Sequence, residues 1–269
     1  RDQPRSRGLG DVYKRQLLDG MVIDQPLFID KEKKQLFGPC DNANFGCFLF
    51  DANVSWVADK MGQLLANGGW MHSVVLDPVD STFVIYRQNT GQLWTQPFDK
   101  NRRTLNPNKA KRIGTLYNTG SNGLCAYNPV DKYVYCVLHS KSAVYRFKLT
   151  RDADGWPALD GDIDEYIPGA GAGFRDGDVQ EAQFKEPRGI AIDKEGNLYI
   201  ADVGNNRIRK VDTKLNVVTT IAGSGAAGYK DGDPLEAQFN QPWGVYLDKN
   251  EFLYIADQNN HCIRKLAIE

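Results

Sequence analysis

Residues 173–211 read GFRDGDVQEAQFKEPRGIAIDKEGNLYIADVGNNRIRKV, and residues 228–266 read GYKDGDPLEAQFNQPWGVYLDKNEFLYIADQNNHCIRKL. The two stretches lie 55 residues apart and align without a gap, with 21 of 39 positions identical. Self-similarity at a fixed period in strand-rich sequence is typical of repeat architectures, in which a unit buries its faces only against its neighbours. This repeat therefore predicts the architecture of the chain.

Each copy is a series of short apolar strands separated by turn residues. The clearer copy contains GIAID (189–193), LYIAD (198–202), RIRKVD (207–212) and VVTTIAG (217–223). Weaker copies precede it in the same order, and the last copy ends before a fourth strand. Four-stranded units in series are typical of β-propeller blades. We predict an all-β propeller of antiparallel blades, with five blades visible at about 27–62, 73–120, 124–171, 189–223 and 244–269.

Two segments do not fit the repeat. Residues 1–16, RDQPRSRGLGDVYKRQ, are basic, lack hydrophobic periodicity and match nothing later in the chain. We expect them to be non-native or disordered, so that the propeller occupies residues 17–269. Residues 149–164, LTRDADGWPALDGDID, interrupt the third copy and predict an exposed loop.

The composition excludes several classes of partner. The chain has 33 lysines and arginines against 34 aspartates and glutamates, so its net charge is −1. This balance argues against a nucleic-acid partner, and no apolar run is long enough to predict membrane insertion. Five cysteines leave one unpaired in any disulfide scheme. Cys40 could pair with Cys47, or Cys125 with Cys136, but buried free thiols in apolar strands are the favoured interpretation, which leaves the redox compartment open.

The repeated segment resembles a known family. PRGIAIDKEGNLYIADVGNNRIRKV (187–211) and PWGVYLDKNEFLYIADQNNHCIRKL (242–266) resemble the NHL repeat, and the preceding GxxDGDxxEAQF linker is similar to that of bacterial members. The resemblance implies a six-bladed propeller, so the five visible blades imply a fragment of one. It also implies a bacterial cell-envelope or extracellular protein, often with an upstream TIG domain.

Function in a propeller concentrates at the channel mouths and on loops. The residue just before the innermost strand of each blade is expected to face the channel mouth. In successive copies this residue is His72, Asn122, Arg188 and Trp243. Such a ring suits a polar ligand, because a tryptophan can stack on a sugar or aromatic face while arginine and asparagine form hydrogen bonds. The alternative is that these side chains only fill the channel.

A zinc enzyme is a less favoured interpretation of the same positions. The fold resembles that of peptidylglycine amidating lyases, in which histidines at this position bind zinc. Here only His72 matches, and His139 and His261 fall in the second turns of their units. A catalytic zinc needs three protein ligands that converge on one point. No nucleophile motif is present either, so we identify no catalytic residue.

Carboxylates recur at two kinds of position in the repeat. Asp202 with Arg209, and Asp257 with Arg264, have the same spacing on adjacent strands and predict structural ion pairs. The DGD turns are weak calcium candidates, because hard cations bind clustered carboxylates, although aspartate and glycine are also ordinary turn residues. Their carboxylates are Asp176, Asp178, Asp231 and Asp233.

These observations favour a non-catalytic recognition propeller that binds a glycan or a protein at the channel mouth. The copies disagree at Arg188 against Trp243 and at Asn206 against His261, and we expect ligand contacts at such mismatches. Two alternatives remain open: a metal-assisted lyase or lactonase, and a structural or assembly module. No cofactor other than calcium is expected, and the oligomeric state is not predicted.

Overall fold

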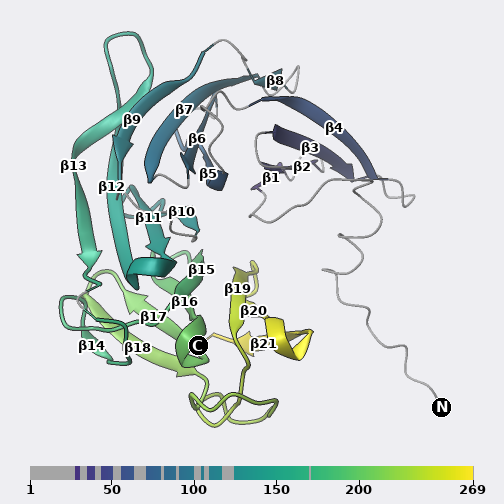
Figure 1. The fold of residues 1–269 in the computed structure, drawn as a ribbon, viewed down its shortest axis with the longest axis vertical. Coiled ribbons are helices and arrows are strands. Elements are labelled where there is room, and N and C mark those ends of the chain that lie inside the picture. Colours follow the sequence, from purple (N-terminus) through teal and green to yellow (C-terminus); the bar gives the residue numbers. More distant parts are fainter. Residues whose placement is uncertain are drawn as a thin grey trace. The chain divides into compact units, whose positions relative to one another are not determined.

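The computed structural model describes residues 28–30, 35–39, 44–50, 56–63, 71–79, 82–88, 91–99, 104–105, 109–116, 124–169 and 171–268. Residues 1–16 lie outside this set. Every described regular element is a β-strand except for three single-turn 3₁₀ helices, so the all-β prediction is confirmed (Figure 1). The chain divides into two compact units, Arg1–Ile113 and Gly114–Glu269. No helix within the described ranges is long and apolar enough to cross a membrane.

The first unit contains two antiparallel sheets. One has the strand order β1-β2-β3-β4, and the other has the order β5-β6-β7-β8, with β9 also paired to β7. The strands of the first sheet are Phe28–Asp30, Gln35–Pro39, Asn44–Phe50 and Trp56–Gln63. Those of the second are Met71–Leu76, Phe83–Gln88, Gln92–Asp99, Thr104–Leu105 and, for β9, Lys111–Thr115, whose last two residues belong to the second unit.

The second unit contains three antiparallel sheets. Their strand orders are β10-β11-β12-β13, β14-β18-β17-β16-β15 and β19-β20-β21. The strands β10 to β13 are Cys125–Tyr127, Tyr133–Leu138, Ala143–Arg151 and Pro157–Ile167. The strands β14 to β18 are Gly177–Asp178, Pro187–Ile192, Leu198–Asp202, Arg207–Asp212 and Val217–Ala222. The strands β19 to β21 are Pro242–Leu247, Phe252–Asp257 and Cys262–Ala267.

Each of these three sheets has a 3₁₀ turn after its second long strand. The turns are η1 (His139–Lys141), η2 (Val203–Asn205) and η3 (Gln258–Asn260). Each turn ends in a left-handed residue, namely Ser142, Asn206 and His261, with φ of 53°, 51° and 53°. The turn therefore lies at the end of the sheet where the innermost strand begins, because Pro187 at the start of β15 pairs with Asp202 at the end of β16.

Both faces of the middle sheet of this unit are buried, which explains its near-continuous apolar strands. Every residue of β16, LYIAD, is buried. Leu198 and Ile200 pack in a core with residues of the β10–β13 sheet, whereas Tyr199 and Ala201 pack with Leu253 and Ile255 of β20. Alternate side chains of a strand point to opposite faces, so a strand between two sheets needs an apolar residue at every position.

The segment 149–164 is not the exposed loop that we predicted. It forms the outer part of the long β12–β13 hairpin, in which Leu149 pairs with Leu159 and Arg151 with Pro157. Only 152–156 form the turn, where the Asp152 carboxylate accepts the backbone N–H groups of Asp154 and Trp156. The aspartates of β13 gave the stretch a loop-like composition, but they are the exposed residues of an outer strand.

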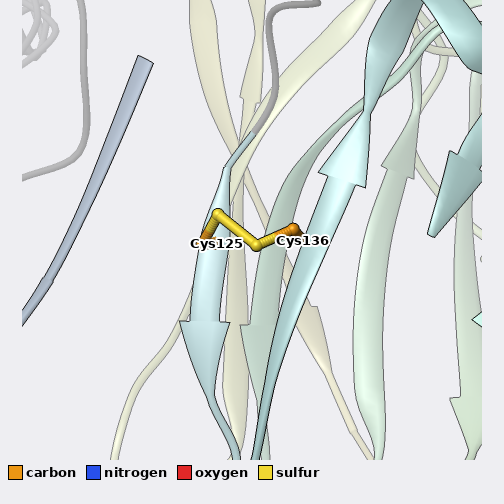
Figure 2. The surroundings of a disulfide bond; sticks show 2 residues. All are labelled: Cys125 and Cys136. Carbon is orange, nitrogen blue, oxygen red and sulfur yellow. A yellow bond between two sulfur atoms is a disulfide. The ribbon is translucent and has the colours of Figure 1, made fainter. Parts of the chain in front are cut away.

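The favoured interpretation of the cysteines as buried free thiols is wrong for Cys125 and Cys136. These residues pair directly across β10 and β11 with a Cα–Cα distance of 4.2 Å, and their sulfur atoms form a disulfide (Figure 2). Cys136 is fully buried. Directly opposed residues on antiparallel strands are close enough for this bond, so strand register rather than apolar composition decides the pairing. Cys262 is free and partly buried.

Candidate functional site

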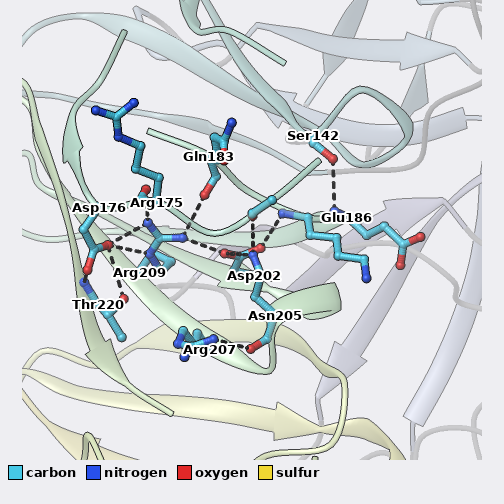
Figure 3. Close-up of polar contacts among 12 residues, drawn as sticks. Ser142, Arg175, Asp176, Gln183, Glu186, Asp202, Asn205, Arg207, Arg209 and Thr220 are labelled. Atoms are coloured by element: carbon cyan, nitrogen blue, oxygen red, sulfur yellow. Dashed lines mark hydrogen bonds and ion pairs between the residues drawn. The ribbon is translucent and has the colours of Figure 1, made fainter. Parts of the chain in front are cut away.

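The buried Arg209 holds the linker of its repeat against strands β16 and β17. Its Nη1 donates to Asp202 Oδ2 at 2.7 Å, and its Nε and Nη2 donate to Asp176 Oδ1 at 3.0 and 2.6 Å (Figure 3). The backbone carbonyls of Gln183 and Arg175 accept the remaining two N–H groups. All five donors of this guanidinium are therefore used, although the side chain is completely buried.

The same network recurs around Arg264 in the last sheet. Its guanidinium donates to Asp257 Oδ2 at 3.0 Å, to Asp231 and to the carbonyls of Gln238 and Lys230. In both copies an asparagine Nδ2 also donates to the buried aspartate at 2.8 Å. The Asp231 side chain is 71% exposed, whereas the matching Asp176 is 40% exposed. The recurrent Asp–Arg spacing therefore forms two structural networks of unequal burial.

The four calcium candidates of the DGD turns have protein partners. Asp176 and Asp231 bind the arginines just described. Asp178 and Asp233 accept the backbone N–H groups of Gln180 and Leu235, each at 2.9 Å, as ordinary turn aspartates do. The glycine of each turn has a positive φ, 125° at Gly177 and 118° at Gly232. This geometry gives the DGD sequence a role in the turn.

Arg188 and Trp243 lie against each other at the starts of the innermost strands β15 and β19. The Arg188 guanidinium carbon lies 3.4 Å from the centroid of the Trp243 ring. The two strands approach so closely that a Cβ on Gly189 would lie 2.7 Å from the Trp243 carbonyl oxygen. On the other side, the backbone N–H of Leu124 donates to the Arg188 carbonyl at 3.3 Å. Adjacent innermost strands thus bring the two predicted mouth residues together.

His139 belongs to the same cluster, and sequence reasoning missed it. It begins η1, and its Nε2 lies 3.0 Å from Arg188 Nη2. The guanidinium always donates, so Nε2 accepts and the neutral ring carries its proton on Nδ1. Burial, and then the charge of Arg188, lower the pKa of His139 below its ordinary value of 6.5, while Glu186 opposes the shift. The sequence signal that could have found His139 is its place in the turn after the second strand. That turn lies at the end of the sheet where the innermost strand begins.

Arg188 is half-buried, and its own charge has no close counterion among the described residues. Burial lowers its pKa to about 10, and Glu186 is the only group that raises it. Its Nε is buried without a hydrogen-bond partner. A guanidinium with this pKa remains positive at neutral pH. The cluster of Arg188, Trp243 and His139, hereafter the mouth cluster, is therefore positively charged and incompletely hydrogen-bonded.

The other two predicted mouth residues, His72 and Asn122, cannot be placed in the mouth cluster from the described part of the structure. His72 lies in β5 of the first unit, and its side chain is outside the described part of the structure. Asn122 is outside the described residues. Asn206, where we expected a ligand contact, instead accepts the backbone N–H of Gln241 through Oδ1 at 2.9 Å. This bond joins neighbouring sheets, as does the bond from the Glu186 N–H to Ser142 Oγ at 3.2 Å (Figure 3).

Within the described residues, no three histidine, cysteine or acidic side chains form a group that could hold a metal ion. In the mouth cluster, the single imidazole is already bonded to a guanidinium. A catalytic zinc site needs three converging protein ligands, and this cluster offers one. Its chemistry is that of a hydrogen-bonding and cation-bearing surface.

Curated relatives match parts of the chain. It is 28% identical over 222 residues to the protein SUPPRESSOR OF QUENCHING 1 of Arabidopsis thaliana, a match that covers 78% of this chain and 20% of that protein. It is 39% identical over 103 residues to NHL repeat-containing protein 2 of Homo sapiens, which covers 36% of this chain and 14% of that protein. The chain thus spans a fifth or less of the length of these relatives.

Solved structures share the fold. A Bacteroides thetaiotaomicron protein of unknown function superposes with a TM-score of 0.70 at 24% identity, over 90% of this chain and 58% of the other. An auxiliary nutrient binding protein from the same organism gives 0.70 at 21%, over 89% and 57%. Virginiamycin B lyase from Staphylococcus aureus gives 0.51 at 13%, over 90% and 69%. These similarities show the β-propeller fold alone.

Family matches cover more than half of the chain, including most of the second unit. Residues 66–230 match the family described as the teneurin NHL domain, and residues 239–266 match the NHL repeat. The second match coincides with the last three strands, and the first includes the complete β15–β18 sheet. The resemblance to NHL repeats is therefore confirmed, and the chain belongs to the family of the teneurin NHL domain, a β-propeller family.

Proposed function

We propose that this protein is a non-catalytic recognition propeller that binds a glycan through the mouth cluster. The observation that carries the proposal is the stack of Arg188 on Trp243, with His139 bonded to the same guanidinium. Three side chains from successive sheets meet there, and four of the five guanidinium donors have no partner among the described residues. Polar groups that converge on one point and remain unsatisfied suit a polar ligand.

A glycan suits this cluster better than a protein surface does. The half-buried residues offer hydrogen-bond donors and an indole edge rather than a wide apolar patch. One face of Trp243 is covered by Arg188, so a sugar would contact the rest of the indole and the free guanidinium donors. Auxiliary nutrient binding proteins share this fold, which supports a nutrient as the ligand.

We place the protein in the bacterial cell envelope or outside the cell. The DGD linker, which is similar to that of bacterial NHL members, supports a bacterial source. The disulfide between Cys125 and Cys136 supports an oxidising compartment, because disulfides persist mainly outside the cytosol.

Glycan and protein arrays test the proposal. The wild-type chain is compared with the double variant Arg188→Ala, Trp243→Ala, and with Arg175→Ala as a matched control. Arg175 also carries a positive charge, but its side chain is 58% exposed, and its ion pair within the described ranges is with Glu181. We expect binding to glycans that the double variant loses and the control keeps.

Two outcomes would contradict the proposal. Equal binding by the wild type and the double variant would remove the mouth cluster as the site. Stoichiometric zinc or calcium in the purified wild type, together with lyase or lactonase turnover, would favour the enzymatic alternative.

A further inference from the structure

The buried arginines of this fold are matched by carboxylates. Arg209 and Arg264 each bind two aspartates and use all five guanidinium donors. Removing an arginine from water is costly, and protein interiors offset this cost with paired charges and complete hydrogen bonding. The two networks show that this chain supplies such partners where an arginine has only a structural role.

Arg188 lacks both kinds of compensation. Among the described residues its guanidinium makes one hydrogen bond, to the neutral His139, and no ion pair with a carboxylate. Its Nε is buried with no acceptor in the part of the chain that the structure describes. The Trp243 ring provides a cation–π contact, which orients the guanidinium plane but does not neutralise the charge. The half-buried guanidinium of Arg188 is therefore held in a fixed orientation. Most of its N–H donors have no acceptor among the described residues.

We propose that the mouth cluster recognises a carboxylate-bearing sugar, such as a uronic or sialic acid, through Arg188. This inference rests on the proposed glycan-binding function and specifies its ligand class. A carboxylate can accept two parallel N–H groups from one guanidinium, and such charge-assisted pairs are among the strongest hydrogen bonds in proteins. Trp243 holds the guanidinium plane, and His139 fixes its rotation through Nη2. Both are positioning residues for Arg188, and the sugar ring would contact the neighbouring indole.

A panel of oligosaccharides tests this inference. Each member carries a uronic or sialic acid and is measured by isothermal titration calorimetry beside its methyl ester, which keeps the shape and removes the charge. We expect binding of at least one free acid and about 10- to 100-fold weaker binding of its ester, the range for losing a charge-assisted hydrogen bond. The variant Arg188→Met should show the same loss for the acid.

Three controls separate binding from folding. Arg188→Met should retain the wild-type melting temperature or raise it, because it removes an unmatched charge from a half-buried position. Arg188→Lys, which keeps the charge without the bidentate fork, should bind the acid with intermediate affinity. Arg175→Met makes the same charge change at an exposed position and should bind like the wild type.

The outcomes distinguish this inference from the function on which it rests. Equal affinity for an acid and its ester would overturn the carboxylate inference and leave glycan binding intact. Binding of no member of the panel would overturn the inference, and neutral glycans on the array would then decide the proposed function. Binding only of acidic peptides, measured in parallel, would overturn both.

Discussion

Replacing the buried Arg209 by methionine tests how the repeat is held together. Methionine fills much of the same volume but provides no donor. The change would leave the completely buried Asp202 without its cation, and the carbonyls of Gln183 and Arg175 would each lose one of their two donors. Removing one partner of a buried ion pair typically costs about 3–5 kcal/mol, mostly because the other charge stays buried and unmatched. We expect the free energy of unfolding to fall by about that amount.

The matched variant is Arg264→Met, at the same position of the next repeat. Arg264 is 8% exposed, and its partner Asp231 is 71% exposed and can be rehydrated when the arginine is lost. We therefore expect a smaller loss of about 1–3 kcal/mol, which is typical of leaving a buried polar group unsatisfied. If sequence identity between the repeats decided the effect, the two substitutions would lower the free energy of unfolding equally. Burial instead predicts a larger loss for Arg209→Met than for Arg264→Met.

Urea unfolding followed by circular dichroism measures both variants. The decisive comparison adds Asp202→Asn to the Arg209→Met background. If an uncompensated charge causes the loss, the double variant should recover about 1 kcal/mol or more relative to Arg209→Met alone. A double variant that is no more stable than the single one would refute this explanation, as would equal losses in the two repeats.

Three further predictions follow from single features of the second unit. Replacing both cysteines of the β10–β11 disulfide by alanine should lower the free energy of unfolding by about 2–3 kcal/mol, because the bond closes a loop with a sequence separation of 11; reducing agent should destabilise the wild type and leave the variant unchanged. Gly189→Ala should cost about 1–3 kcal/mol in urea unfolding, because its Cβ would press on backbone atoms, whereas Gly244→Ala should be nearly neutral because its nearest neighbour in the described part of the chain is 3.8 Å away. An acidic ligand should raise the lowered pKa of His139 when it binds at Arg188, so its affinity should increase as pH falls below 6.5, and His139→Gln should flatten this dependence.

Each of these predictions has an outcome that contradicts it. Equal sensitivity of the wild type and the cysteine variant to reducing agent would argue against the disulfide as the stabilising group. Similar losses of stability in the two glycine variants would mean that the close approach of β15 and β19 does not explain the effect of Gly189→Ala. An affinity that stays constant as pH falls from 7.5 to well below 6.5 would separate His139 from the ligand, with Glu186 and Arg188 remaining the charges that face it.

The repeat predicted the sheets because the same residues recur where the backbone needs them. The buried strand LYIAD and the Asp–Arg spacing are visible in the sequence, since both copies require them. The β12–β13 hairpin was missed because this strand pair belongs to one blade only, and its exposed aspartates imitate a loop. A feature that occurs once has no second copy to reveal its register.

The candidate site could be predicted only in part for the same reason. Arg188 and Trp243 were found by reading one position through the repeats, but His139 occupies a different position of the repeat. It reaches Arg188 across the boundary between sheets, where strand register within one blade gives no information. Asn206 shows the converse error, because a mismatch between copies there reflects a bond between sheets rather than a ligand contact.

Two arginines of the same sheet therefore show how a structural arginine differs from a candidate ligand-binding arginine. Arg209 and Arg188 both lose water on folding, yet the chain provides two carboxylates and two carbonyls for the first and a neutral imidazole for the second. Stability alone would favour an apolar side chain at position 188, because an unmatched charge there opposes folding. A chain that builds complete arginine networks twice within 55 residues has no structural reason to leave a third one incomplete. The incomplete hydrogen bonding of Arg188 is thus the strongest argument that its partner comes from outside the chain.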